Sequence, residues 1–314
     1  MSIFISIASY RDPDLMNTIN SAIDNADNPD EIVFGVVIQD FIEDIPNFKE
    51  LSNMRIIKMH PKYAKGAGYA RSRAMELYNN EEYYLQIDSH TRFEKSWDSM
   101  CIDQHNKAKE ISKNEKIILS YFPPPFYIES NKTISFPKKN KERPARPTKQ
   151  WPIFTEKKEW TAKRIDLLSN ENPEMSATVL AGFIFTTGNI VAEIPYDPEI
   201  AFFGEEICFS MRAWTRGWDI YSPCKTILYH FYTREGYKKI WKDRNLRGIS
   251  WKEVEEKSQQ KQMRVLCGIE DGIFGAGKYR HLKLYEKLCD IDFKSVYGLT
   301  KENNESTIDL ESRE

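Results

Sequence analysis

Short apolar runs alternate with helical segments through the first third of the chain. The first run covers residues 3–8, and apolar residues follow it at helical spacing from Leu15 to Ala26. Further runs lie at 31–38, 54–59 and 83–87, with a helical segment at 68–78. Runs this continuous are typical of strands buried on both faces of a parallel sheet. The alternation predicts an α/β fold with right-handed crossovers and a mainly parallel central sheet flanked by helices.

The rest of the chain continues this pattern. We expect helices over 97–111, 205–216, 250–266 and 280–288, and strands over 117–122, 178–186, 218–221 and 227–230. Asp12 is expected to cap the first helix, and Ser250 with Glu253 is expected to form a capping box. Residues 138–164 hold ten Lys or Arg, three Glu and three Pro. This composition predicts a long basic loop region.

Composition limits the class of protein. With 13% aromatic residues among 314, the chain is not a disordered polymer. Its 45 basic and 47 acidic residues give a net charge of −2, which argues against nucleic-acid binding through overall charge. No apolar run approaches the roughly 20 residues that span a bilayer. Five scattered Cys without a CxxC pair predict neither a disulfide framework nor a zinc cluster, and they indicate a reducing, cytoplasmic setting.

Polar residues directly follow two of the predicted strands, at 9–12 and at 88–90. Ligands bind beyond the carboxyl ends of strands in open α/β sheets, so we expect both segments to line one cleft. Asp88 and His90 are two residues apart, which lets both side chains reach one ion in an extended segment. A carboxylate with an imidazole suits Mn²⁺ or another oxygen-preferring cation such as Mg²⁺. The alternative is a polar loop in which Asp88 caps the next turn.

Three further places offer candidate site residues. His230 ends an aromatic strand and is either a packed core residue or the third metal ligand. Gly66, Arg71 and Arg73 lie at the start of a helix, where they favour phosphate binding or form a solvated basic face. Glu205 and Glu206 begin another helix, where they either favour its dipole or present one carboxylate to the substrate in the cleft.

Several segments together resemble one known family. They are the runs ISIASYRDP at 5–13, KGAGYAR at 65–71, IDSH at 87–90, AGFIF at 181–185, FGEEI at 203–207 and YH at 229–230. They resemble the GlcNAc-transferase family of GT-A glycosyltransferases, whose members include cytoplasmic enzymes that transfer N-acetylglucosamine from UDP-GlcNAc to hydroxyproline of a protein. The resemblance implies a Rossmann-like GT-A catalytic domain over 1–235. We expect a mostly helical extension over 236–297 and a disordered tail over 298–314.

The resemblance also implies roles for individual residues. Ser9, Tyr10 and Arg11 would lie at the uridine end of a UDP-sugar pocket that also includes Gly66, Arg71, Arg73 and Asp88. Asp88, His90 and His230 would hold Mn²⁺ or Mg²⁺, and Glu205 and Glu206 are the catalytic candidates. The family retains the anomeric configuration, so the metal would neutralise charge on the departing UDP and no strong general base would be needed.

The acceptor stays open at this point. It would be a protein, a glycan or another hydroxyl-bearing molecule. The basic 138–164 segment suggests an anionic acceptor, modified DNA included, unless that segment is simply a solvated loop. Two other functions use the same residues. One is a metal-dependent phosphodiester hydrolase, and the other is a non-catalytic module that binds nucleotide-sugars or glycans.

Overall fold

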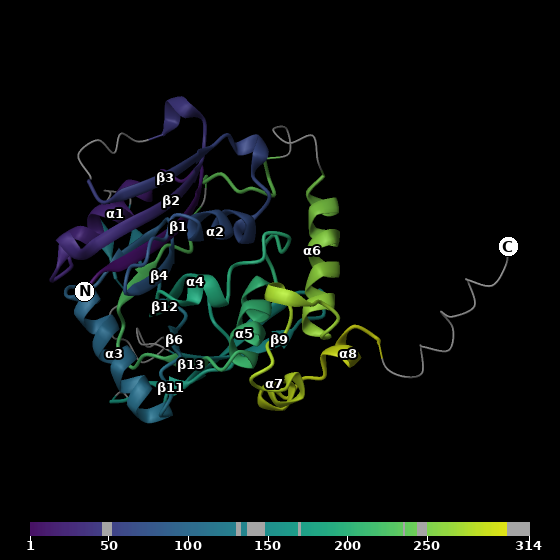
Figure 1. Ribbon diagram of the computed structural model, residues 1–314. Helices are drawn as coiled ribbons and strands as arrows, with labels where there is room; N and C mark the ends of the chain where they lie inside the picture. Colours follow the sequence, from purple (N-terminus) through teal and green to yellow (C-terminus); the bar gives the residue numbers. More distant parts are fainter. Residues whose placement is uncertain are drawn as a thin grey trace.

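The computed structural model describes residues 1–45, 52–129, 133–136, 148–168, 171–234, 236–243 and 250–299. Its centre is an eight-stranded, mostly parallel sheet (Figure 1). In spatial order the strands are β11 (Glu174–Met175), β13 (Asp219–Ser222), β6 (Ile117–Ser120), β12 (Phe183–Thr187), β4 (Tyr83–Asp88), β1 (Ile3–Tyr10), β2 (Ile32–Gln39) and β3 (Met54–Met59). Strand β12 runs antiparallel to β4 and β6, and β11 runs antiparallel to β13. The α/β prediction is confirmed.

Both faces of the sheet are buried, as the continuous apolar runs predict. Alternate β1 residues point to opposite faces: Ile5 packs with α1 (Leu15–Asp24) and α3 (Trp97–Ser112). Phe4 lies in a second cluster with residues of α2 (Ala67–Met75), α4 (Ile190–Glu193) and α5 (Glu205–Thr215). The sheet is therefore the middle layer of three.

Smaller elements surround this centre. Strand β5 (Thr91–Phe93) pairs with β14 (Leu228–His230), β7 (Tyr127–Ile128) with β8 (Ile134–Ser135), and β9 (Thr148–Phe154) with β10 (Trp160–Asp166). Helices α6 (Trp251–Leu266), α7 (Leu282–Cys289) and α8 (Phe293–Val296) pack with α5 around a third apolar cluster. These helices form the green and yellow edge of the molecule in Figure 1.

Four local predictions differ from the structure. The first helix begins at Leu15 with Asp14 at its N-cap, so Asp12 lies outside it. Strand β12 is shorter than the predicted 178–186. Ser250 occupies the N-cap of α6 without a side-chain capping bond. Most importantly, 148–164 is not a loop, because β9 and β10 pair along their whole length.

Two sequence expectations concern segments that the structure describes only in part. Residues 137–147 and 300–314 lie outside the described residues. They include the first ten residues of the predicted basic segment and most of the predicted disordered tail. The predicted domain boundary at 235 stays a prediction. Helices α6 and α7, which follow that boundary, share a core with α5, which precedes it.

Candidate functional site

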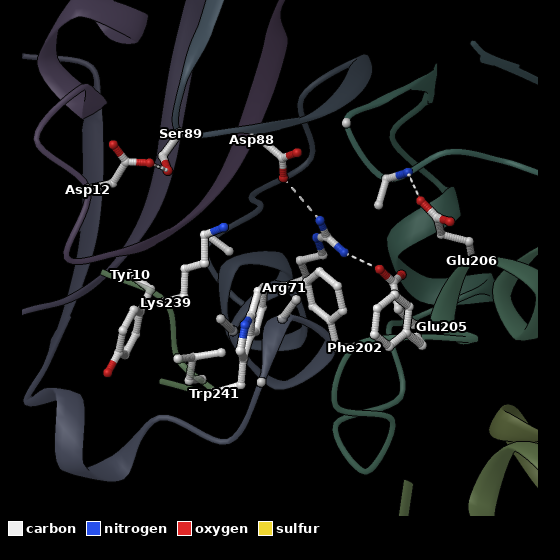
Figure 2. Close-up of a pocket in the computed structure, with 18 of the residues that line it drawn as sticks. Tyr10, Asp12, Arg71, Asp88, Ser89, Phe202, Glu205, Glu206, Lys239 and Trp241 are labelled. Atoms are coloured by element: carbon white, nitrogen blue, oxygen red, sulfur yellow. Dashed lines mark hydrogen bonds and ion pairs between the residues drawn. The ribbon is translucent and has the colours of Figure 1, made fainter. Parts of the chain in front are cut away.

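A cavity of about 330 Å³ opens at the carboxyl ends of β1 and β4. Tyr10 and Asp12 line it from the end of β1, and residues 88–90 line it from the end of β4. The opposite wall is the start of α5, residues 204–206. Figure 2 shows Glu205 and Glu206 on this wall. The predicted shared cleft is confirmed, because the two polar strand ends line one cavity.

Asp88, His90 and His230 form a candidate metal centre in this cavity. One ligand atom from each lies within 4.8 Å of the others. The pairing of β5 with β14 sets His230 opposite Thr91, which brings it to the Asp88–His90 turn. His230 Nε2 lies 2.9 Å from Asp88 Oδ2, and the two imidazole rings are 4.5 Å apart.

The hydrogen bonds of His90 fit a metal ligand. Its Nδ1 lies 2.7 Å from Asp12 Oδ2, while its Nε2 is buried with no hydrogen-bond partner among the described residues. Metal-bound imidazoles are commonly oriented in this way, with a carboxylate on the nitrogen that does not bind the ion. The predicted ligand set therefore fits a divalent cation.

Asp12 belongs to the 9–12 segment that the sequence predicts to line the cleft, but its role at the metal centre was not predicted. Its Oδ1 accepts from the Asp14 backbone N–H at 3.0 Å, and its Oδ2 accepts from Ser89 Oγ at 2.8 Å as well as contacting His90. The position of Asp12 at a strand end that faces the cleft was the available signal. The local helix-capping rule suggested a competing role for the same residue.

Protonation in the centre also favours a cation. Burial alone would raise the pKa of Asp88, but the hydrogen bond from His230 and the charge of Arg71 hold that pKa well below its ordinary value. Burial and the neighbouring His90 lower the pKa of His230 to about 4. At neutral pH the cluster thus offers an ionised carboxylate and a neutral His230 imidazole.

Arg71 links the metal centre to the opposite wall. Its guanidinium contacts Asp88 Oδ1 at 3.1 Å and pairs with Glu205 (Figure 2). All but 6% of Arg71 is buried. Gly66 allows α2 to begin here, because its φ of 120° is in the region open to glycine and a Cβ would lie 2.3 Å from the Ala201 carbonyl oxygen.

The two adjacent glutamates have different environments. Glu205 is buried and paired with Arg71, so the guanidinium fixes its carboxylate. Glu206 is partly exposed in the cavity, and its Oε1 accepts from the Ala181 backbone N–H at 2.7 Å. Burial and the charge of Glu205 raise the pKa of Glu206 to about 8. Glu206 is therefore the carboxyl group available to a ligand, and Glu205 is a fixed part of the wall.

The structure brings most, but not all, of the predicted residues together. Eight line the cavity: Tyr10, Gly66, Arg71, Asp88, His90, Glu205, Glu206 and His230. Ser9 is buried, with its carbonyl accepting from Gln39. Arg11 pairs with Asp243 at 2.8 Å outside the cavity lining. Arg73 points away and pairs with Glu76 on the surface.

A second missed part of the site is the segment 238–241, which lines the cavity (Lys239 and Trp241 in Figure 2). Asp243 fastens this segment to the β1 end, because it accepts from both Tyr10 Oη, at 3.0 Å, and Arg11. Arg234 also lines the cavity, with Nη1 3.3 Å from His90 Nδ1. No periodicity in the sequence distinguishes these residues from the helices that follow.

Comparisons with known proteins agree with this fold. Among the described residues, no helix has the length and apolar character needed to cross a membrane. No curated protein sequence matches the chain. Among solved structures it resembles GalNAc-T7 in complex with UDP, GalNAc and Mn²⁺, at 17% identity and a TM-score of 0.62. This match covers 99% of the chain and 58% of GalNAc-T7, so the chain spans little more than half of that protein's length.

Another similar structure is that of residues 1–349 of TarS of S. aureus, with 13% identity, a TM-score of 0.46, and coverage of 84% of this chain and 72% of that fragment. The fold shared with GalNAc-T7 is that of GT-A glycosyltransferases. The sequence model of one protein family, described as glycosyltransferase (GlcNAc), matches residues 2–52 and 48–295, which is nearly the whole chain. The chain therefore belongs to the GlcNAc family of glycosyltransferases.

Proposed function

We propose that this glycosyltransferase moves N-acetylglucosamine from UDP-GlcNAc to an acceptor hydroxyl with retention of configuration and with help from a divalent cation. One observation carries the proposal. Asp88, His90 and His230 converge in the cavity, and the buried Nε2 of His90 has no partner there among the described residues. The name of the family supports the donor sugar, and the UDP and Mn²⁺ bound to GalNAc-T7 support the nucleotide and the metal.

Mn²⁺ or Mg²⁺ would be held by Asp88, His90 and His230. A cation there would neutralise negative charge on the departing UDP. Asp12 holds the His90 ring through the 2.7 Å contact at Nδ1, which would leave Nε2 free to bind the ion. Arg234 adds a fixed positive charge beside the centre, which suits a diphosphate.

The donor would lie between the two strand ends and the start of α2. Tyr10 and Arg11 are proposed for the uridine end, where Asp243 orders both side chains. Gly66 lines the cavity at the N-terminus of α2, and a helix N-terminus favours negative charge such as that of a phosphate. Arg71 forms ion pairs with Asp88 and Glu205, so we propose that it positions these two carboxylates.

The glutamates support chemistry without a strong base. Glu205 is neutralised by Arg71, and the raised pKa of Glu206 keeps that carboxyl protonated at neutral pH. A protonated Glu206 would donate a hydrogen bond to a sugar or acceptor oxygen. The acceptor hydroxyl would attack the anomeric carbon on the face from which UDP departs, so that a new carbon–oxygen bond forms as the bond from that carbon to UDP breaks. The proton of the hydroxyl would pass to a phosphate oxygen of the leaving UDP. Retention follows from attack on that face.

A donor screen tests the proposal. Purified protein is incubated with UDP-GlcNAc, UDP-GalNAc or UDP-glucose, with Mn²⁺ or with a chelator, and UDP release and sugar transfer are measured. We expect Mn²⁺-dependent release of UDP, greatest with UDP-GlcNAc, and its loss in His90→Gln. Arg73→Gln is the matched control, because Arg73 lies outside the cavity. NMR of the first product tests retention through the anomeric proton.

Other outcomes of the screen would overturn the proposal. Cleavage of a phosphodiester without sugar transfer would indicate a hydrolase. Tight binding of UDP-sugars with no turnover toward any acceptor or water would indicate a binding module. For the compartment, we propose the cytoplasm. The five cysteines are free and buried, which supports a reducing setting.

A further inference from the structure

The hairpin of β9 and β10 has one edge held by the protein and one edge open. On the β9 side, Gln150 N donates to Ser176 Oγ at 3.1 Å, and Gln150 O accepts from Ala177 N at 2.9 Å. Among the described residues, β10 pairs with no strand other than β9. The open edge of this hairpin is therefore β10.

The register shows which backbone groups face the open edge. Because Gln150 points its N–H and C=O away from β10, Trp151 and Ile153 point theirs toward it, opposite Lys163 and Thr161. The alternate β10 residues, Ala162 and Arg164, thus direct their N–H and C=O outward. Pro152 fits this register, because its missing N–H would also face away from β10.

This open edge runs along the rim of the catalytic cavity. Trp160 and Thr161 line the cavity, whereas no β9 residue does. Ala162 lines a smaller hollow with Gly204 and Glu206. Farther along β10, Arg164 lies 3.9 Å over the ring of Phe122, which stacks on Tyr232 beside His230. The strand thus passes from the wall with Glu206 to the side of the metal centre.

The same hairpin carries unpaired positive charge. Lys157, Lys158, Lys163 and Arg164 are exposed, and none forms an ion pair with a described residue. Lys149, by contrast, is paired with Glu174 at 2.9 Å. Lys163 points to the outer face, opposite to the face on which Arg164 packs against Phe122. This edge therefore offers an acidic partner both outward N–H and C=O groups for hydrogen bonds and cations for ion pairs.

We propose that β10 binds the acceptor by strand addition, and that the acceptor is an extended, acidic polypeptide. An added peptide strand would form ladder hydrogen bonds with Ala162 and Arg164, which neither a glycan nor DNA can form. Its side chains would alternate, so the acceptor hydroxyl would enter the cavity while the neighbouring residues face outward near Lys163. Acidic residues next to the hydroxyl residue would meet that lysine. This inference rests on the proposed function and names its acceptor class.

The first test separates backbone recognition from charge. The probes are short fluorescent peptides with a central serine, threonine or hydroxyproline flanked by glutamate or by lysine, and their binding is measured by anisotropy without donor or metal. Ala162→Pro removes one outward N–H and leaves the bonds to β9, so we expect at least about tenfold weaker binding of the glutamate peptides. Ala162→Val, which keeps the N–H, is the matched control and should bind normally.

A second measurement uses the unaltered protein. N-methyl groups are placed one at a time along the best glutamate peptide. Strand addition predicts that binding is lost at every second position and kept at those between. If loss follows no two-residue period, strand addition is wrong, whatever Ala162→Pro does to folding.

Charge is tested by Lys163→Glu, with Lys257→Glu on the exposed outer face of α6 as the control. We expect Lys163→Glu to weaken the glutamate peptides about fivefold and to favour the lysine peptides, while Lys257→Glu does neither. Preference of the unaltered protein for duplex DNA carrying hydroxymethylated bases, or for a phosphorylated glycan, would overturn the inference. Because peptide binding needs no donor, peptide binding without UDP-sugar turnover would refute the proposed function alone, and turnover without peptide binding would refute this inference alone.

Discussion

Asp12 gives the sharpest test of how the metal centre is built. Its carboxylate accepts on both sides, from the Asp14 N–H at Oδ1 and from Ser89 and His90 at Oδ2. In Asp12→Asn one oxygen becomes an NH₂ donor, so one of these two sides always loses its acceptor. The side chain is only 3% exposed, and water cannot replace the lost bond. The substitution also removes the negative charge that supports the His90 imidazole.

We expect Asp12→Asn to weaken Mn²⁺ binding by about 10-fold to 100-fold, the usual effect of losing a carboxylate behind a metal-bound histidine. This corresponds to about 1.4–2.7 kcal/mol of binding free energy. Asp12→Ala, which removes both acceptors, should weaken binding at least as much. Titration calorimetry with Mn²⁺ in the presence of UDP measures the effect, and the thermal unfolding midpoint of each variant reports on the fold.

Asp30→Asn is the control, because it removes the same charge from an exposed position. If Asp12→Asn bound Mn²⁺ as tightly as Asp30→Asn does, His90 would not be oriented by Asp12, and our interpretation of the unpartnered Nε2 would be wrong. If Asp12→Asn showed both weaker Mn²⁺ binding and a lower unfolding midpoint, the weaker binding would instead be attributed to disruption of the N-terminus of α1 at Asp14.

Three further predictions concern the walls of the cavity. Gly66→Ala should lower the free energy of unfolding by at least about 2 kcal/mol in denaturant titrations, because the new Cβ would meet the Ala201 carbonyl at a backbone φ of 120°. An unchanged free energy of unfolding would show that Gly66 does not lie this close to Ala201. Arg71→Met should cost about 3–5 kcal/mol by leaving Glu205 buried without its partner, and the double variant with Glu205→Gln should recover part of that loss. Glu206 has a raised pKa in the fold, so the unfolded state gains stability as the pH rises from about 4.5 to about 8; the advantage of Glu206→Gln in unfolding midpoint should grow across that range and level off above it. A constant difference between pH 5 and pH 8 would contradict the raised pKa.

Apolar runs were a reliable guide to the sheet. Strands buried on both faces have no polar alternation to confuse with a helix, and β1, β2 and β4 lie close to their predicted ranges. The half-buried edge strand β3 has the predicted range as well. The hairpin of β9 and β10 was missed because its lysines and prolines have low strand propensity. It folds because Trp151, Phe154 and Trp160 pack against the helices that follow residue 250, a contact between distant segments that local pattern does not reveal.

The site was predictable where chemistry and local spacing coincide. Asp88 and His90 are two residues apart at a strand end, and that spacing alone predicted their convergence. Arg73 was grouped with Arg71, but two residues along a helix turn the side chain by about 200°, so when Arg71 faces the cavity Arg73 faces solvent. The segment 238–241 reaches the cavity through tertiary contacts of Asp243, for which the sequence offers no pattern.

The proposed function depends on Asp88, His90 and His230 as the metal ligands. Pulsed electron paramagnetic resonance of bound Mn²⁺, in protein with ¹⁵N-labelled histidine and with UDP present, tests this ligand set directly. We predict hyperfine coupling to two imidazole nitrogens in the unaltered protein, and to one in His90→Gln and in His230→Gln. Mn²⁺ that binds without histidine coupling, or with coupling that neither substitution changes, would contradict the account.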